Sequence, residues 1–272
     1  MGVLDGRVAL VTGASRGIGV GIARRLAAEG AAVAVSARSL DAHTHLPGTL
    51  HETVEAIRKG GGRAVAIAAD LADPDARPGI VARARAALGE IDILVNNAAA
   101  CFFMPYLKSS ASRFRIAFEV NVRAPFELGQ LVAPGMIERR RGWILNISSA
   151  TAELPQGPPW NAFQAETGDL LYGGSKAALN RITVGIAAEL WRHGIVVSSL
   201  APVAQVVTPG TAALGIDAGE ENIEAVEVMA EAALALVSCG QELSGRNHYS
   251  RPLLGALGRA VRTLDGKGIH PA

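Results

Sequence analysis

The sequence predicts one α/β domain whose core is a doubly wound parallel sheet of about seven strands, with helices on both faces. Short apolar, β-branched runs alternate with alanine-rich stretches of helical length along the chain. The predicted strands are apolar on both faces, as strands are when helices cover both sides of a sheet. A length of 272 residues with 49% hydrophobic side chains suits one large core, and no composition break marks a second domain.

The predicted elements follow one another over residues 1–272 as a single domain. Strands are expected at Arg7–Val11, Ala31–Ser36, Arg63–Ala68, Ile91–Val95, Trp143–Ile147, Ile195–Leu200 and Asn247–Ser250. Helices are expected at Gly17–Glu29, His51–Lys59, Pro74–Leu88, Tyr172–Trp191 and Glu224–Ser238. A long helix within Ser112–Arg140 should bend or break at Pro125 and Pro134, because proline lacks the amide donor of a helix interior. Insertions near 39–50 and 153–171 interrupt the alternation, and such long loops are usually functional or mobile.

Composition excludes several classes of protein. A net charge of +1 argues against nucleic-acid binding. Two cysteines, Cys101 and Cys239, make no disulfide framework, and no signal peptide is recognised, so a cytoplasmic location is expected. The uncharged stretch Gly194–Ile216 contains Pro202 and Pro209, which favour a strand and loop over a membrane span. Six histidines show no metal-ligand spacing, so no metal is expected.

The first predicted strand runs directly into a glycine-rich turn and then a helix. The turn reads Thr12-Gly13-Ala14-Ser15-Arg16-Gly17-Ile18-Gly19. Glycine permits the tight turn and lets a pyrophosphate approach the backbone. The helix N-terminus then offers free N–H groups and a positive dipole end to that phosphate. The pattern predicts a dinucleotide site, the alternative being a structural turn.

The end of the second predicted strand bears on the choice of cofactor. An acid there would hold the ribose hydroxyls and favour NAD, but the chain has Ser36-Ala37-Arg38. Arg38 and Arg16 can clamp a 2′-phosphate with their planar guanidinium groups. We therefore expect NADP, with NAD possible, unless Arg38 is a solvated surface side chain.

A tyrosine and a lysine four residues apart open a predicted helix. The chain has three tyrosines and four lysines, so chance would give this spacing only roughly 0.04 times. Tyr172 and Lys176 fall on one helix face. A free phenol has a pKa of about 10, and a nearby ammonium lowers it toward the range useful for acid–base catalysis. The alternative is an unremarkable surface pair.

The TGxxxGxG turn and the Tyr-xxx-Lys pair together resemble those of the short-chain dehydrogenase/reductase family, over nearly the whole chain. The resemblance implies a Rossmann-type fold and hydride transfer by a Tyr-Lys-Ser mechanism. It places the catalytic serine at Ser149, with Ser148 the alternative, and its hydroxyl would bond the substrate oxygen. It also implies that Asn121 holds a water in a proton relay toward Lys176.

The same resemblance implies a set of cofactor-binding residues, with Asp70 contacting the adenine amino group. The set is Gly13, Ser15, Arg16, Gly17, Ile18, Gly19, Arg38, Asp70, Leu71, Asn97, Ala98, Tyr172, Lys176 and Thr208. Two residues depart from the family's usual glycines, Ala99 after the fourth strand and Val203 after the sixth. The family usually has about a dozen residues between its serine and tyrosine, whereas 22 separate Ser149 from Tyr172. We interpret the extra residues as an insertion over the substrate.

An apolar alcohol or ketone is the expected substrate. Apolar side chains gather in the loop after the fourth strand and in the second insertion, at Phe102, Phe103, Met104, Trp160 and Phe163. The segment Ser39–Leu50 also resembles, locally, hydroxysteroid-dehydrogenase-like members of the family.

Two alternatives remain open. One is an NAD-dependent dehydrogenase, and the other is a catalytically idle scaffold that binds nucleotide. The family often assembles through the helices that correspond to Ser112–Arg140 and Tyr172–Trp191, which implies a homotetramer or homodimer.

Overall fold

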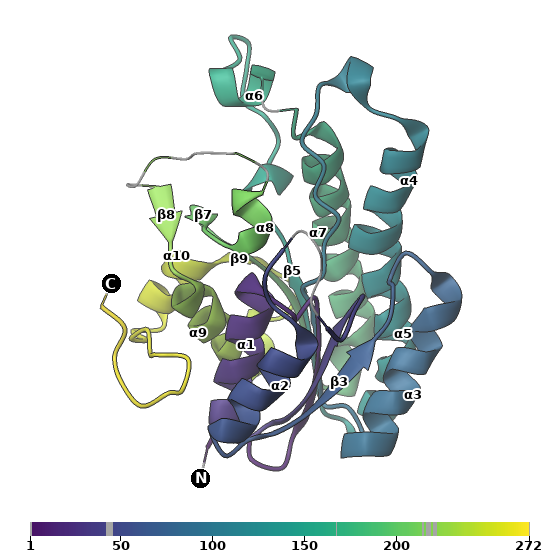
Figure 1. Ribbon diagram of the computed structural model, residues 1–272, viewed down its shortest axis with the longest axis vertical. Coiled ribbons are helices and arrows are strands. Elements are labelled where there is room, and N and C mark those ends of the chain that lie inside the picture. The colour runs from purple at the N-terminus through teal and green to yellow at the C-terminus, as the bar shows by residue number, and fades with distance from the viewer. Residues whose placement is uncertain are drawn as a thin grey trace.

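The computed structural model describes residues 2–41, 46–166, 168–213, 215, 219 and 222–271. A parallel sheet of seven strands crosses its centre in the order β3-β2-β1-β4-β5-β6-β9 (Figure 1). The strands are β1 (Val8–Thr12), β2 (Ala32–Ala37), β3 (Arg63–Ala68), β4 (Ile93–Asn96), β5 (Gly142–Ile147), β6 (Ile195–Ala201) and β9 (Asn247–Tyr249). The chain reverses its direction of travel across the sheet between β1 and β4, and ligands of such sheets bind at that switch point beyond the carboxyl ends.

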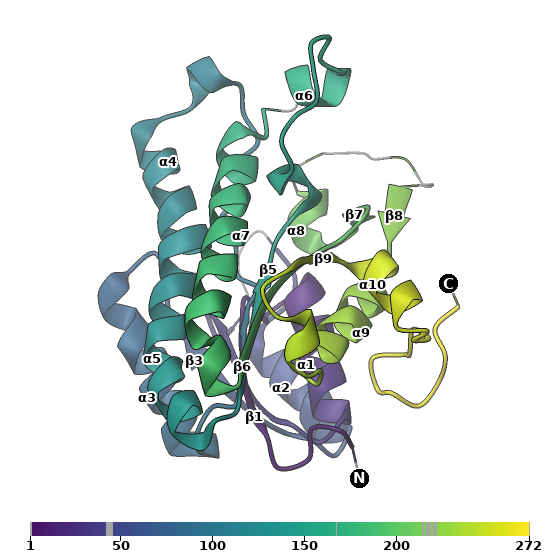
Figure 2. The same cartoon turned by 180° about the vertical axis from the view of Figure 1, so that it is seen from behind.

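Helices cover both faces of the sheet, as the doubly apolar strands predict. On one face lie α1 (Gly17–Ala28), α2 (Leu50–Lys59) and α9 (Val226–Leu236), packed on alternate strand residues such as Val11 and Val33. On the other face lie α3 (Arg77–Leu88), α5 (Ala124–Arg139) and α7 (Leu170–Leu190), packed on Leu10 and Leu94 (Figure 2). The period of two along each strand thus divides one sheet between two apolar cores.

The long helix expected between β4 and β5 is interrupted by a π-helical turn just before Pro125. Helix α4 (Ala111–Phe118) passes through a π-helical turn, Glu119–Arg123, into α5. Pro125 lies in the first turn of α5, which continues directly from the π-turn, and Pro134 lies inside that helix. The π-turn contains Asn121, the residue four positions before Pro125 whose carbonyl a proline cannot bond, so the interruption agrees with Pro125, whereas Pro134 is accommodated inside α5.

The sequence pattern does not predict several short elements. They are α6 (Ala162–Glu166), α8 (Pro209–Ala212), α10 (Ser250–Ala256) and the two-stranded parallel pair β7 (Gln205–Val206) and β8 (Ile223–Glu224). Glu224, expected at the start of a helix, lies in β8 instead. Of the first insertion, residues 42–45 lie outside the described part. Within the part of the chain that the structure describes, no helix is long and apolar enough to cross a membrane.

Candidate active site

The carboxyl ends of the strands bring the expected site residues to one edge of the sheet. Thr12, Asn96 and Ile147 end three neighbouring strands, β1, β4 and β5, and the loops that follow carry most of those residues. They fall into two groups. Ser149, Tyr172 and Lys176 meet beyond β5, while the glycine loop, Asn97 and Thr208 meet beyond β1.

Ser149 and Tyr172 meet in space despite the residues between them. The Ser149 side chain lies close enough to the Tyr172 phenol to lower its pKa. The Ser149 hydroxyl also accepts hydrogen bonds from the Thr151 amide at 3.2 Å and the Thr151 hydroxyl at 2.9 Å. A Cβ atom added to Gly173 would lie 2.5 Å from the Thr151 carbonyl oxygen. Helix α7 can therefore begin this close to the end of β5 only because residue 173 is glycine.

Lys176 lies beneath Tyr172, one helical turn along α7. Its side chain is 2% exposed, and Nζ donates a 2.7 Å hydrogen bond to the Ile147 carbonyl. Nζ lies 5.7 Å from the centroid of the Tyr172 ring. Burial lowers the pKa of Lys176 to about 8 and raises that of Tyr172 above its ordinary value, while the nearby Ser149 side chain lowers the Tyr172 pKa. In the protein alone, Tyr172 is thus a neutral phenol at pH 7.

Two neighbours complete this group, and the sequence patterns do not mark either as reactive. Cys101 is close enough to exchange electrostatic effects with both Tyr172 and Lys176, and burial raises the pKa of its thiol to about 11. In the sequence, the position of Cys101 shortly after β4 indicates that it lies at the carboxyl edge of the sheet, near the site. The Phe103 ring lies 5.7 Å from that of Tyr172, centroid to centroid. Both side chains give the phenol an apolar surrounding.

Asn121 is fully buried in the π-turn and braces two segments. Its Oδ1 accepts from the Ala100 amide at 2.8 Å, and its Nδ2 donates to the Ala100 carbonyl at 2.9 Å and to the Ser175 hydroxyl at 2.9 Å. The amide therefore ties the loop after β4 to helix α7 beside Lys176. Ser148 is buried too, with its hydroxyl unbonded, and its amide donates to Leu200 on β6.

The glycine loop beyond β1 is packed tightly by the residues expected to share its ligand. Gly13 has φ +65°, and a Cβ there would lie 2.7 Å from the Ala98 Cα. The Asn97 side chain donates to the Gly13 carbonyl at 3.1 Å. Gly17 has φ +57°, and a Cβ there would lie 2.9 Å from the Thr208 methyl group. Glycine is required at both positions by backbone angle and by space.

The start of α1 is open to an anion. Its N-cap, Arg16, caps no amide with its side chain, and the first turn holds no acid. By contrast, α2 begins with a capping box between Thr49 and Glu52. The N–H groups and the dipole of α1 thus face the glycine loop with neither a side-chain cap from Arg16 nor an acid in the first turn.

The two arginines near this loop differ in their surroundings. Arg38 follows β2, is exposed, and has no acidic partner among the residues that the structure describes. Arg16 is partly buried; its Nη2 donates to the Gly48 carbonyl at 3.2 Å, and its Nε has no hydrogen-bond partner. Both leave N–H groups for a ligand at this side of the loop. These groups fit a phosphate of a dinucleotide.

The remaining expected cofactor contacts lie after β3. Asp70 is exposed, and its carboxyl group accepts from the Ala72 amide at 2.9 Å. Leu71 is buried, and its carbonyl accepts from the buried Arg77 guanidinium, which also pairs with Glu119. Asp70 is therefore held in a turn with its second oxygen outward.

The apolar residues expected to line a substrate pocket are only partly gathered. The Met104 amide donates to the Gly168 carbonyl at 2.8 Å, so the loop after β4 meets the second insertion. The Arg113 guanidinium lies 5.9 Å from the Phe102 ring centroid and contacts the Met104 sulfur. Trp160 is 55% exposed. The Phe163 side chain lies outside the described part.

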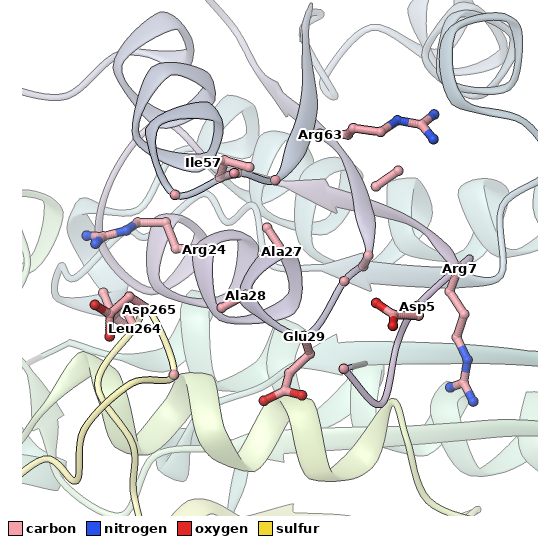
Figure 3. A pocket seen from close by; sticks show the side chains of 18 of the residues that line it. Asp5, Arg7, Arg24, Ala27, Ala28, Glu29, Ile57, Arg63, Leu264 and Asp265 are labelled. Atoms are coloured by element: carbon pink, nitrogen blue, oxygen red, sulfur yellow. The ribbon is translucent and has the colours of Figure 1, made fainter.

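A cavity of about 930 Å³ lies at the opposite edge of the sheet (Figure 3). Asp5 and Arg7 before β1, Arg24 and Glu29 near the end of α1, and Asp265 line it. It is separated from Tyr172 by the length of the strands and is no part of the catalytic group. Among the described residues, no three histidine, cysteine, aspartate or glutamate side chains come together to hold a metal.

Comparisons with known proteins agree with this geometry. The family model described as short chain dehydrogenase matches residues 7–217. Hydroxysteroid dehydrogenase-like protein 2 of Xenopus laevis is 30% identical over 270 residues, which are 99% of this chain and 62% of that protein. The chain thus spans about three fifths of the length of such curated relatives.

Solved structures are similar over most of their length. A short chain dehydrogenase from Mycobacterium thermoresistibile is 30% identical with a TM-score of 0.82, covering 97% of this chain and 93% of that one. A metagenomic short-chain oxidoreductase in complex with NADP is 31% identical with a TM-score of 0.72, covering 91% and 98%. The family model and these similarities lead to one conclusion: the chain belongs to the short chain dehydrogenase family of oxidoreductases, which bind a nicotinamide cofactor.

Proposed function

We propose that the protein transfers hydride between NADP(H) and an apolar alcohol or ketone, with Tyr172 as the acid–base group. The observation that carries this proposal is the arrangement around the phenol: the Ser149 side chain is close enough to lower its pKa, and Lys176 Nζ lies 5.7 Å from the ring centroid. General acid–base catalysis of this kind contributes about 10²- to 10⁴-fold to a rate.

The proposed reaction divides between three side chains. In the direction of reduction, Tyr172 Oη donates its proton to the substrate oxygen, and the Ser149 hydroxyl holds that oxygen by a hydrogen bond. The Lys176 ammonium stabilises the phenolate that remains. The bound nicotinamide supplies or accepts the hydride. Asn121 holds α7 to the loop after β4, and its role in a proton relay toward Lys176 is part of the proposal.

Arg38 supports NADP over NAD in this proposal. The extra phosphate brings about two negative charges. An exposed guanidinium with no acidic partner among the described residues suits it, and no carboxylate at Ala37 repels it. The NADP complex of the metagenomic relative supports the same cofactor. In the proposed complex, Gly13, Ser15, Gly17, Ile18, Gly19, Asn97, Ala98, Asp70, Leu71 and Thr208 hold the rest of the dinucleotide.

The substrate class rests on the apolar surroundings of the phenol. Phe103 and Cys101 flank Tyr172, and burial has the largest effect on the pKa of its phenol. A panel of ketones and alcohols, followed by NADPH oxidation or NADP reduction at 340 nm, tests the proposal. Turnover of apolar ketones supports it; binding of NADPH without turnover of any member favours a nucleotide-binding scaffold.

We further propose that the protein is a homo-oligomer of a reducing, cytoplasmic compartment. Exposed apolar side chains on the outer helices support association: Phe114 on α4, Phe126 on α5 and Val184 on α7 are 52%, 39% and 37% exposed. Both cysteines are free. Sedimentation at micromolar concentration tests the assembly, and a single species of 28.1 kDa contradicts it.

A further inference from the structure

A second loop borders the site after β6, and two short paired strands, β7 and β8, join its two ends. It leaves the sheet at Pro202 and returns at β8. Strands β7 and β8 pair in parallel, with Gln205 opposite Ile223 and Val206 opposite Glu224. The Glu224 side chain, at this junction, is 1% exposed. A carboxyl group buried so completely needs polar partners.

The Glu224 carboxyl group links three segments. Its Oε2 accepts from the Ser250 hydroxyl at 2.8 Å and from the Val203 amide at 3.3 Å, and lies 3.6 Å from Arg251 Nε. Oε1 is buried without a hydrogen-bond partner. Burial raises the pKa of the carboxyl group, against the lowering effect of these partners. The Glu224 carboxyl group therefore holds together the start of the loop, its end and the first turn of α10.

A continuous path of contacts runs from this point to the glycine loop. Val206, paired with Glu224, accepts a 2.9 Å hydrogen bond at its carbonyl from the Thr211 hydroxyl. Thr211 and Thr208 form a capping box, with hydrogen bonds of 2.8 and 3.1 Å. The Thr208 methyl group in turn occupies the space over Gly17. Glu224 itself touches neither the glycine loop nor the catalytic group.

We propose that Glu224 is a positioning residue that holds Thr208 against the glycine loop and so sets the affinity for the dinucleotide. The proposal rests on the proposed function, in that the glycine loop binds this cofactor. The carboxyl group acts through the Val203 amide and the β7–β8 pair. Its loss frees both ends of the loop, so binding must then order that loop as well.

The experiment compares Glu224→Ala with Glu224→Gln in two measurements. Hydrogen exchange of the Val203, Thr208 and Thr211 amides reports the loop in the cofactor-free protein. Fluorescence titration reports the Kd of NADPH. For Glu224→Ala we expect about tenfold faster exchange at these amides and about fivefold weaker NADPH, the effect of about one lost hydrogen bond. Glu224→Gln keeps an oxygen acceptor and should restore both to within about twofold.

Glu231→Gln is the matched control. Glu231 is also a 1% exposed glutamate, but it pairs with Arg25 on α1 and with Arg259, neither of which belongs to the loop after β6. Glu231→Gln should lower the free energy of global unfolding. The exchange rate of the loop amides relative to amides that exchange only by global unfolding should stay unchanged. Ser250→Ala removes one donor to Glu224 and should give the same changes in smaller measure, which keeps the test available if Glu224→Ala fails to fold.

The outcomes separate the positioning role from the proposed function. If the loop amides exchange at the wild-type rate in both Glu224→Ala and Ser250→Ala, the positioning role is wrong. It is also wrong if the loop amides exchange faster only in proportion to the loss of global stability. Loosening of the loop with unchanged NADPH affinity overturns the coupling to the cofactor. Failure of the wild-type protein to bind NADPH or NADH at all overturns the proposed function, whatever the exchange shows.

Discussion

The two halves of the carboxyl edge are built in opposite ways. Around β5 and α7, the reacting groups are hydrogen-bonded to the protein, and burial shifts their pKa values. Around β1 and β2, Arg38 is exposed and the α1 N-terminus lacks a side-chain cap. The first half is complete before a ligand arrives, whereas the second leaves positive charge for an anion to neutralise. Changes in the first half should therefore affect turnover and stability, and changes in the second should affect affinity.

Tyr172→Phe should have the largest effect, and it should affect turnover but not cofactor affinity. The change deletes the proton donor and keeps the ring that packs on Phe103. We expect kcat to fall about 10²- to 10⁴-fold while the Kd of NADPH stays within about twofold. Steady-state kinetics and a binding titration measure the two. Activity near that of the wild type would refute the assignment of Tyr172.

Gly173→Ala tests whether the catalytic half depends on close backbone approach. The added methyl group meets the Thr151 carbonyl oxygen at 2.5 Å, so α7 must shift away from β5. We expect a loss of about 1–3 kcal/mol in the free energy of unfolding, and lower kcat.

Gly174→Ala is the matched control, because a Cβ at that position meets no atom within 4 Å. Since alanine favours helix, this variant should be as stable as the wild type or gain up to about 1 kcal/mol. Equal effects of the two substitutions in urea unfolding would refute the close-approach argument.

Arg38→Ala probes the open half. It should weaken NADPH binding at least tenfold, or about 1.4 kcal/mol, and NADH binding much less. Arg63→Ala, an exposed arginine at the opposite end of the neighbouring strand β3, should change neither. Titration of both cofactors against the three proteins decides the matter. A wild-type preference for NADH, or an equal loss for the two cofactors, removes the NADP assignment and leaves the dehydrogenase.

The smallest effect is a pH dependence of the stability of the cofactor-free protein. The folded pKa of Lys176, about 8, lies below its ordinary value of 10.5. Between these values the unfolded chain holds a proton that the folded chain lacks, so stability rises with pH, by at most about 1.4 kcal/mol per pH unit. Cys101, with its pKa raised from 9.0 to about 11, increasingly opposes this trend as the pH rises through 9.0.

Urea unfolding at about pH 7.5 and about pH 9 should therefore show wild type gaining stability relative to Lys176→Met, which cannot titrate. A constant difference between the two proteins would show that Lys176 is not desolvated in the folded state.

Local patterns in the sequence predicted the sheet and the family of the chain. Strand alternation, the glycine turn and the Tyr172–Lys176 spacing depend on neighbouring residues, and the sheet and the family are confirmed. Features that depend on distant contacts were missed. The carboxyl group of Glu224, placed at a helix start by its apolar neighbours, is buried in β8 because Val203 and Ser250 meet it from other parts of the chain.

The same limit applies within the site. The close approach of Gly173 to Thr151, which brings Ser149 near Tyr172, is not revealed by spacing along the chain. Cys101 enters the group only through the sheet order, which sets β4 beside β5. The roles assigned to individual cofactor residues remain predictions.

The contact between Gly173 and Thr151 also bears on how such proteins diversify. Because it closes the base of the segment between Ser149 and Tyr172, the catalytic geometry is independent of how much chain lies between. Each doubling of a closed loop costs only about 0.6 kcal/mol in closure entropy. The residues between Thr151 and Tyr172 can therefore be exchanged, shortened or extended to fit another substrate while the proton donor stays where it is.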